Sequence, residues 1–339
     1  MNVLNVTYIL PLRRDAPDDS PEFALYLRWL ARQVDELIVV DGSPADVYAA
    51  HAARWSGCVR HLGVDGDLIS PNGKVGGVLT GVRHALHERL VLADDDVRYD
   101  AAALRRVVAL LDGAHLVRPQ NYFDPLPWHA RWDTGRTLVN RLLDGDWPGT
   151  LALRRSALRA TGGYDGRALF ENFELVRTLV AAGGIECVAA DLFVRRLPPT
   201  ARHFWSQRTR QAYDEFARPL RFAVSIALLP VIAALALRRR WTALAAGAGS
   251  VVAAAEAGRR RGGGQAVFGA TAALWSPLWV LERAVCSWLA LGVRLVFGGV
   301  RYRGGILRHA ATPLPVLRHR LKAAGIRLDP PAARPARVE

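Results

Sequence analysis

The sequence places three aspartates in a row, Asp94-Asp95-Asp96, directly after the apolar run Leu90–Ala93. Three adjacent carboxylates repel one another unless water or a cation neutralises them. If the apolar run is a buried parallel strand, the aspartates lie at its carboxyl end, which is where α/β sheets bind ligands. Two aspartates one residue apart can hold a hard divalent cation, and that cation can hold a diphosphate. The alternative is a polar strand exit followed by a helix that Asp100 opens.

Up to about residue 200, short β-branched runs alternate with helical stretches, which predicts an α/β fold with a doubly wound, mostly parallel sheet. The expected strands are Val3–Leu10, Glu36–Val40, Val59–Leu62, Leu90–Ala93 and His115–Arg118, and the expected helices are Pro21–Gln33, Lys74–His87 and Ala101–Leu111. The run Leu37–Val40 has no polar alternation, as expected of a strand buried on both sides. Asp41 follows it, so Asp41 and the aspartate triplet should frame one crevice.

The composition favours a membrane partner over a nucleic acid. The 339 residues are 51% hydrophobic and carry a formal charge of +14, almost wholly from arginine, with Lys74 and Lys322 as the only lysines. No basic and aromatic interleaving typical of nucleic-acid modules is present, whereas juxtamembrane basic residues gain about 1 kcal/mol each from anionic lipid. The three cysteines match neither a disulfide framework nor a zinc site, so a reducing compartment is expected. The N-terminus does not have the pattern of a signal peptide.

Beyond residue 217 the sequence turns apolar. Four stretches approach the roughly 20 residues that span a bilayer; they are Leu220–Leu237, Trp241–Ala257, Ala266–Leu281 and Ala284–Phe297, the last of which could instead be interfacial. A buried helical bundle is the alternative, but the arginine clusters between the runs favour membrane helices. The positive-inside rule puts the catalytic domain and Arg259–Arg261 on the cytoplasmic side, while Arg238–Arg240 conflicts with it and leaves the number of spans open.

Four segments fall at the strand and helix ends that one known fold requires; they are Ile9-Leu10-Pro11, Leu37–Ser43, Gly73–Leu79 and Val91–Val97. In order and spacing they resemble the family-2 glycosyltransferases of the GT-A fold, in particular the membrane-anchored branch that includes ceramide glucosyltransferases. The resemblance covers about residues 3–215. It implies that Asp94 and Asp96 hold Mg²⁺ or Mn²⁺ against a nucleotide-sugar donor, and that Asp41 contacts the nucleotide. Lys74 begins a helix whose dipole favours an anion, so it either reaches the nucleotide or is simply a solvated lysine.

The acceptor side departs from the family pattern. Leu169–Leu175 resembles the family's "E-D-x-x-L" helix start, whose aspartate is the general base, but Asn172 stands at that position. An amide cannot act as a base at neutral pH. Glu171 and Glu174 are the nearby substitutes, with Glu171 preferred, unless both merely enrich the first turn of a helix. A polyprenyl-phosphate acceptor, which is already ionised, would need no base and is the alternative.

His203–Gln211 resembles the family's "Q/R-x-x-R-W" motif, with Gln207 and Arg210 in place and Gln211 where tryptophan is usual. Gln207 and Arg210 lie three apart, on one helix face. In the family this helix closes over the diphosphate, which suits the bidentate guanidinium of Arg210. Trp205 is the candidate to replace the missing tryptophan.

A second aromatic cluster, Trp128–Asp133, suits either a sugar face in the acceptor pocket or a membrane interface. The expected organisation is a GT-A domain (1–198), an interfacial amphipathic helix (199–218), a membrane region (219–300) and a basic tail (301–339), disordered over Arg327–Glu339. The expected function is a multi-pass cell-membrane glycosyltransferase, inverting by family resemblance, that moves a sugar to a lipid or lipid-linked acceptor. A degenerate membrane scaffold is the non-enzyme alternative. Nucleotidyl transfer is disfavoured because no glycine-rich loop follows the first strand.

Overall fold

An eight-stranded sheet in the order β3-β2-β1-β4-β7-β6-β8-β5 forms the centre of the protein, and the computed structural model describes residues 3–17, 20–143, 145–302 and 305–331. The strands are β1 (Leu4–Leu12), β2 (Val34–Asp41), β3 (Arg60–Leu62), β4 (Arg89–Ala93), β5 (Val97–Arg98), β6 (Leu116–Phe123), β7 (Thr150–Arg154) and β8 (Glu186–Arg196). Strands β3, β2, β1 and β4 run parallel, whereas β7 is antiparallel to both β4 and β6. The expected α/β fold with a parallel-rich sheet is therefore confirmed, and β7 and β8 are strands that the sequence pattern did not reveal.

Helices cover both faces of the sheet because successive strand residues point to opposite sides. Tyr8 packs in the apolar core under α1 (Pro21–Leu30) and α4 (Ala101–Ala109). Ile9, the next residue, packs in the second core with four helices, α3 (Gly73–His84), α6 (Arg155–Ala160), α7 (Glu171–Ala181) and the C-terminal α12 (Leu314–Ala323). The remaining helices of this part are α2 (Ala45–Arg54), α5 (Trp128–Leu143) and α8 (Ala201–Ala212).

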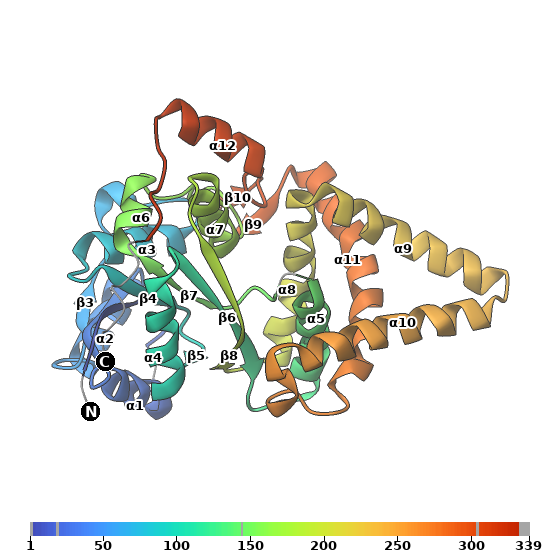
Figure 1. Ribbon diagram of the computed structural model, residues 1–339, viewed down its shortest axis with the longest axis horizontal. Helices are drawn as coiled ribbons and strands as arrows, with labels where there is room; N and C mark the ends of the chain where they lie inside the picture. Colours follow the sequence, from blue (N-terminus) through green and yellow to red (C-terminus); the bar gives the residue numbers. More distant parts are fainter. Residues whose placement is uncertain (1–2, 18–19, 144, 303–304, 332–339) are drawn as a thin grey trace, which may run out of the picture.

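The helices α9 (Pro219–Leu237) and α10 (Trp241–Arg260) project from two separate places on the body and converge at Arg238–Arg240, far from the sheet (Figure 1). Among the described residues, α9 is the one helix long and apolar enough to cross a membrane, with a mean hydropathy of 2.3 and 6% of its window buried. By itself this is weak support for a span. The expectation of up to four spanning helices is not supported.

The third apolar run was expected to be helical throughout, and that expectation is wrong. A short turn of 3-10 helix (Ala272–Trp275) lies in the middle of this run. Helix α11 (Ser276–Phe297) begins only after that turn, with Pro277 in its own first turn. Proline at this position starts a helix readily but cannot continue one from before. The second half of the third run and the whole fourth run therefore form a single helix.

Helix α11 is amphipathic rather than apolar all round. Glu282 and Arg283 are buried on its inner face. Arg283 Nη1 lies 3.1 Å from Asp214 Oδ1 and Arg208 Nη1 lies 3.4 Å from Glu282 Oε2, which ties α11 to α8 and to the segment that follows α8. The opposite face exposes an apolar stripe; its members are Leu278, Leu281, Val285, Trp288, Leu289, Leu295 and Val296. This pattern is typical of a surface helix.

The C-terminal residues return to the sheet. A two-stranded ribbon, β9 (Val300–Tyr302) and β10 (Gly305–Leu307), precedes α12 (Leu314–Ala323), which packs beside α7 (Figure 1). Leu328 is buried and its backbone N–H donates to Ala182 O at 2.8 Å. The expectation of disorder from Arg327 is thus wrong for Arg327–Pro331, because Leu328 fills an apolar site against α7. Residues 332–339 lie outside the described part.

Candidate active site

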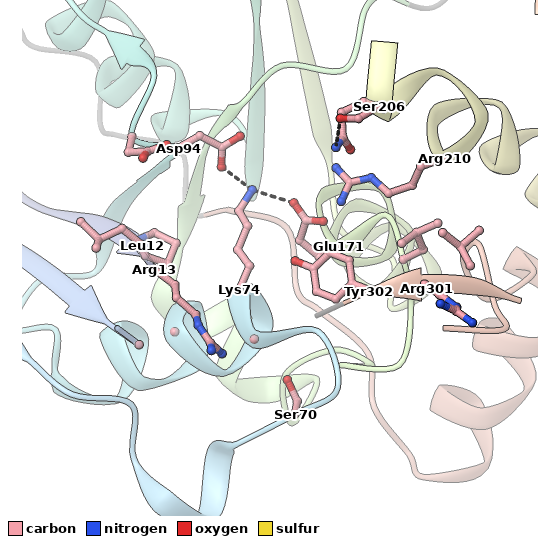
Figure 2. A pocket seen from close by; sticks show the side chains of 18 of the residues that line it. Leu12, Arg13, Ser70, Lys74, Asp94, Glu171, Ser206, Arg210, Arg301 and Tyr302 are labelled. Carbon is pink, nitrogen blue, oxygen red and sulfur yellow. Dashed lines mark hydrogen bonds and ion pairs between the residues drawn. The ribbon is translucent and has the colours of Figure 1, made fainter. Parts of the chain in front are cut away.

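A cavity of about 1050 Å³ lies at the carboxyl ends of β1, β2 and β4, where an α/β sheet is expected to bind ligands. One wall comes from the sheet and from the start of α3. The other comes from α8, the end of α11 and β9. Figure 2 shows that Lys74 points upward from α3 into the space between Asp94 and Glu171.

Close packing of α3 against β1 positions Lys74. Asn72 caps the helix by accepting the Lys74 backbone N–H at 3.3 Å. A Cβ atom on Gly77 would lie 2.9 Å from Pro11 Cβ, so glycine is needed where the helix crosses the strand. This approach brings the first turn of α3 over the end of β1 and directs its lysine toward β4.

Lys74 bridges the two acidic elements of the cavity. Its Nζ donates to Glu171 Oε1 at 2.6 Å and forms an ion pair with Asp94. Burial disfavours the charged ammonium, but the carboxylates of Asp94 and Glu171 outweigh it and raise the pKa of Lys74. The lysine therefore stays protonated and is held by two carboxylates, so it is not simply a solvated lysine. Its contact with a nucleotide stays a prediction.

The other two aspartates of the triplet also face arginines. Asp96 Oδ2 accepts a 2.8 Å hydrogen bond from Arg196 Nε, and Asp95 Oδ2 lies 2.7 Å from Arg14 Nη2. Burial raises the pKa of Asp96, and Arg196 opposes this rise. Arg196 lies at the end of β8, a hundred residues from Asp96 in sequence.

The residues at this edge fit a divalent cation. Asp96 Oδ1 is buried and has no hydrogen-bond partner in the described part of the protein, although a carboxylate oxygen there calls for one. A Cβ on residue 149 would lie 2.9 Å from Asp94 Oδ2, so Gly149 leaves room beside that oxygen. Among the described residues, no group of three or more His, Cys, Asp or Glu is arranged so that it could hold a metal ion by itself. A cation held here would take its other ligands from phosphate oxygens and water, as Mg²⁺ commonly does.

Asp41 does not line the cavity. Its buried carboxylate lies 2.7 Å from His51 Nδ1 and 3.1 Å from His61 Nε2. Burial works against its ionisation, but hydrogen bonds from His61, Ser43 and His51 outweigh it and hold the pKa of Asp41 well below its usual range. Asp41 also accepts the backbone N–H of Ser43 at 2.9 Å and so fixes the backbone beside Gly42, which does line the cavity. A direct contact of Asp41 with a nucleotide stays a prediction.

One face of α8 forms much of the far wall. His203, Gln207 and Arg210 line the cavity from this helix. The Arg210 guanidinium lies 5.6 Å from the ring centroid of Tyr302 on β9, and Tyr302 Oη donates to Asn72 Oδ1 at 3.4 Å. The cavity is therefore closed by a contact that runs from α8 through β9 to the cap of α3.

The three candidates for the base separate clearly. Glu171 lines the cavity. Asn172 does not, and its Nδ2 donates to Pro148 O at 3.2 Å. Glu174 is fully buried and its Oε2 accepts the backbone N–H of Thr312 at 2.6 Å. The suggestion that Glu174 acts as the base is not supported by the structure, because its carboxylate points into the contact with the C-terminal segment.

Trp205 and Trp128 lie outside the cavity. Their rings are 6.1 Å apart, and both are about half exposed, at 50% and 45%. The structure therefore does not support the suggestion that Trp205 replaces the missing tryptophan as an acceptor platform. Together with Trp132 and Phe204 they form a surface aromatic cluster.

Several residues at the site were not assigned a role from the sequence, among them Arg13, Arg14, Arg196, Arg301 and Tyr302. The two arginines after β1 could have been suspected because they follow a strand end. Tyr302 and Arg196 carry no local signal, since each reaches the site only through the fold; Tyr302 is 230 residues from Asn72.

No protein-family model matches the sequence, and no curated protein does. The fold and the position of the cavity define a mixed α/β protein with a ligand site at the carboxyl edge of its sheet. Among solved structures, it is similar to the mannosyltransferase PcManGT from Pyrobaculum calidifontis, solved in complex with GDP-Man and Mn²⁺. The identity is 20%, the match covers 87% of this chain and 88% of that one, and the TM-score is 0.52. At this identity the similarity shows the fold alone, a mixed α/β fold with a parallel-rich sheet.

Two more distant structures are mannosyl-3-phosphoglycerate synthase from Rubrobacter xylanophilus and glucosyl-3-phosphoglycerate synthase from Mycobacterium tuberculosis. The first is 14% identical over 60% of this chain and 70% of that one, with a TM-score of 0.40. The second is 16% identical over 59% and 74%, with a TM-score of 0.39. These two similarities are too low to support any statement about this chain.

Proposed function

We propose that the protein is a metal-dependent glycosyltransferase that moves a sugar from a nucleotide-sugar donor to a lipid or lipid-linked acceptor at a membrane. The observation that carries the proposal is the cavity at the carboxyl edge of a GT-A-type sheet, in which Lys74 connects Asp94 to Glu171. A donor's leaving group and an acceptor's hydroxyl must meet at one carbon atom. The residues that bind the leaving group and the residue that activates the hydroxyl therefore have to be neighbours. Here Lys74 forms ion pairs with a candidate of each kind, Asp94 and Glu171.

The donor would lie on the sheet side. Val40, Val64 and Ile69 give this end an apolar lining that suits a nucleobase, and glycines leave room beside it. Lys74 lies in the first turn of α3, where backbone N–H groups and the helix dipole favour a diphosphate. Arg14 adds a second cation, so this edge can stabilise the negative charge that develops on the departing nucleoside diphosphate.

Asp94 and Asp96 would hold the metal, Mg²⁺ or Mn²⁺, which when bound supplies positive charge to the leaving diphosphate. Arg196 fixes the orientation of Asp96 through its 2.8 Å hydrogen bond. The mannosyltransferase of similar fold was solved with GDP-Man and Mn²⁺, which supports a nucleotide-sugar and metal pair for this cavity.

Glu171 would remove the proton from an acceptor hydroxyl. It lines the cavity on the acceptor side of Lys74, and a carboxylate in hydrogen-bond reach of the nucleophile is the usual base in such a reaction. The side chain reaches this place because α7 begins at Glu171, at the edge of the cavity.

A phosphate acceptor is the second candidate. Glu171 already has an ion-pair partner in Lys74, and the acceptor wall carries Arg210 and Arg301. Two guanidinium groups suit phosphate oxygens better than a neutral hydroxyl. A polyprenyl phosphate would present an ionised nucleophile and leave Glu171 without a role as base.

The membrane part of the proposal rests on the surface of the C-terminal helices. Helix α9 is apolar and mostly exposed, and Arg238–Arg240 cap the end of the α9–α10 pair. The exposed apolar stripe of α11 continues toward Val293 and Phe297, which line the cavity. We propose that the α9–α10 pair enters the cell membrane, with the catalytic domain on the cytoplasmic side and the acceptor reaching the cavity from the lipid surface. The positive-inside rule favours this orientation for Arg259–Arg261, while Arg238–Arg240 would lie on the opposite side, against the rule.

The test is transfer by detergent-solubilised protein across a panel of nucleotide sugars with Mn²⁺ and membrane lipid extract. Metal-dependent release of nucleoside diphosphate should be lost in Asp96→Asn. The matched control is Asp191→Asn, which removes an aspartate from an exposed surface ion pair with Arg106 and should keep wild-type turnover. Folded protein that turns over no donor would refute the enzyme proposal and favour the degenerate scaffold.

A further inference from the structure

Each carboxylate of the aspartate triplet already has a cationic partner from another element. The pairs are Asp94 with Lys74 from α3, Asp95 with Arg14 after β1, and Asp96 with Arg196 from β8. Arg196 also approaches Asp94, with Nη2 3.6 Å from Oδ2. The triplet is thus balanced charge for charge by the protein itself.

A divalent cation without a bound diphosphate gains little binding free energy from carboxylates whose charge is already neutralised. To coordinate Asp94 it must displace the Lys74 ammonium, and a positive charge this close to the carboxylate repels an incoming cation strongly where water is partly excluded. Asp96 Oδ1 is the buried oxygen of the triplet that has no hydrogen-bond partner in the described part of the protein, and one such oxygen is too few for a hard cation that prefers several oxygen ligands.

A nucleoside diphosphate changes this balance because it brings negative charge to the same edge. The Lys74 ammonium, at the first turn of α3, can then pair with phosphate oxygens instead of Asp94. The same change would release Glu171, since the one lysine holds both carboxylates.

We propose that Lys74 couples the metal to the donor: it withholds Asp94 from a bare divalent cation and yields it when a nucleoside diphosphate takes over the ammonium. This inference rests on the proposed function, because it assigns the diphosphate to the same cavity. It makes Lys74 a positioning residue that gives the site an order of assembly, in which metal and diphosphate are retained together.

The experiment measures free Mn²⁺ by electron paramagnetic resonance during titration of the full protein, with and without GDP or UDP. Wild type should retain little Mn²⁺ alone and bind it when the diphosphate is present. Lys74→Met should bind Mn²⁺ alone about tenfold more tightly than wild type or better, because a partly exposed cation next to the ligand has been removed. The matched control is Lys322→Met on α12, which removes the other lysine and should behave as wild type.

A second measurement leaves Lys74 in place. The chain has two lysines, so reductive ¹³C-methylation gives two lysine signals besides that of the terminal amine, and Lys322→Met assigns them. Mn²⁺ should broaden the Lys74 signal strongly only when the diphosphate is present. Equal broadening by Mn²⁺ alone would overturn the proposal.

The outcomes separate the two proposals. If the protein binds the diphosphate but Lys74→Met binds bare Mn²⁺ no more tightly than wild type, the role of Lys74 is overturned and the donor site stands. If no GDP or UDP is bound under any condition, the donor site itself is refuted.

Discussion

Glu171 and Glu174 offer a matched pair of substitutions in the first turn of α7, because both are glutamates and only one faces the cavity. A positioned general base contributes about 10²–10⁴ in rate, equivalent to about 3–5 kcal/mol of barrier. Glu171→Gln should therefore lower kcat for a hydroxyl acceptor by that factor. Its folded stability should change by less than about 1 kcal/mol, since Lys74 keeps its ion pair with Asp94.

Glu174→Gln should show the opposite pattern. Its Oε2 accepts the Thr312 backbone N–H at 2.6 Å, and glutamine can keep a neutral hydrogen bond there. The free energy of unfolding should fall by the difference between a charged and a neutral hydrogen-bond acceptor, about 1 kcal/mol. This should appear as a lower Tm with kcat unchanged.

The assay is single-turnover transfer at saturating donor and Mn²⁺, together with thermal unfolding of both variants. Wild-type kcat in Glu171→Gln with a hydroxyl acceptor would refute the base assignment. The same result with a phosphate acceptor would instead favour the second candidate function. A large loss of kcat in folded Glu174→Gln would contradict the choice of Glu171 over Glu174 as the base.

Three further outcomes are expected. Arg141→Met should lower the free energy of unfolding by about 3 kcal/mol, because buried Arg141 donates to Gly258 O and Arg261 O and so holds the end of α10 to the body; chemical denaturation measures this. Val231→Asp on exposed α9 should abolish flotation with anionic phosphatidylglycerol vesicles, whereas Leu86→Asp, on the α/β part, should not. The depressed pKa of Asp41 means that its ionised form contributes stability above about pH 4, lost as pH falls below that value; Asp41→Asn should therefore lower Tm more at pH 7 than at pH 3.

The sequence predicts the parts of the site that depend on local pattern. Asp94 and Asp96 follow a continuous apolar run, so both the strand and its carboxyl end can be read directly. Glu171 was identified as the better base candidate because it neighbours the position of the family aspartate. Arg196 and Tyr302 could not be found in this way, since neither the end of β8 nor the β9 ribbon has a sequence pattern that reports which loop it meets.

The periodicity of helices and strands explains why Trp205 and Asp41 do not line the cavity. Residues in a helix advance by about 100°, so Trp205 lies nearly opposite Gln207, and a face that presents Gln207 and Arg210 to the cavity turns Trp205 away. In a strand, neighbouring side chains point to opposite faces of the sheet. Val40 lines the cavity, so Asp41 points to the other side of the sheet, where His51 and His61 meet it.

The C-terminal helices do more in this protein than a membrane anchor would need to do. Arg208 lies on the buried face of α8, and its Nη1 is 3.0 Å from Asp133 Oδ1 on α5 and 3.4 Å from Glu282 Oε2 on α11. A buried ion pair of this kind gives little net stability but fixes one arrangement, because either charge left alone would be strongly unfavourable. The neighbouring residues Gln207 and Arg210 take their positions from that arrangement. The acceptor wall is therefore set by contacts with α11, so a lipid surface that engages the apolar stripe of α11 would act directly on the helix that closes the cavity.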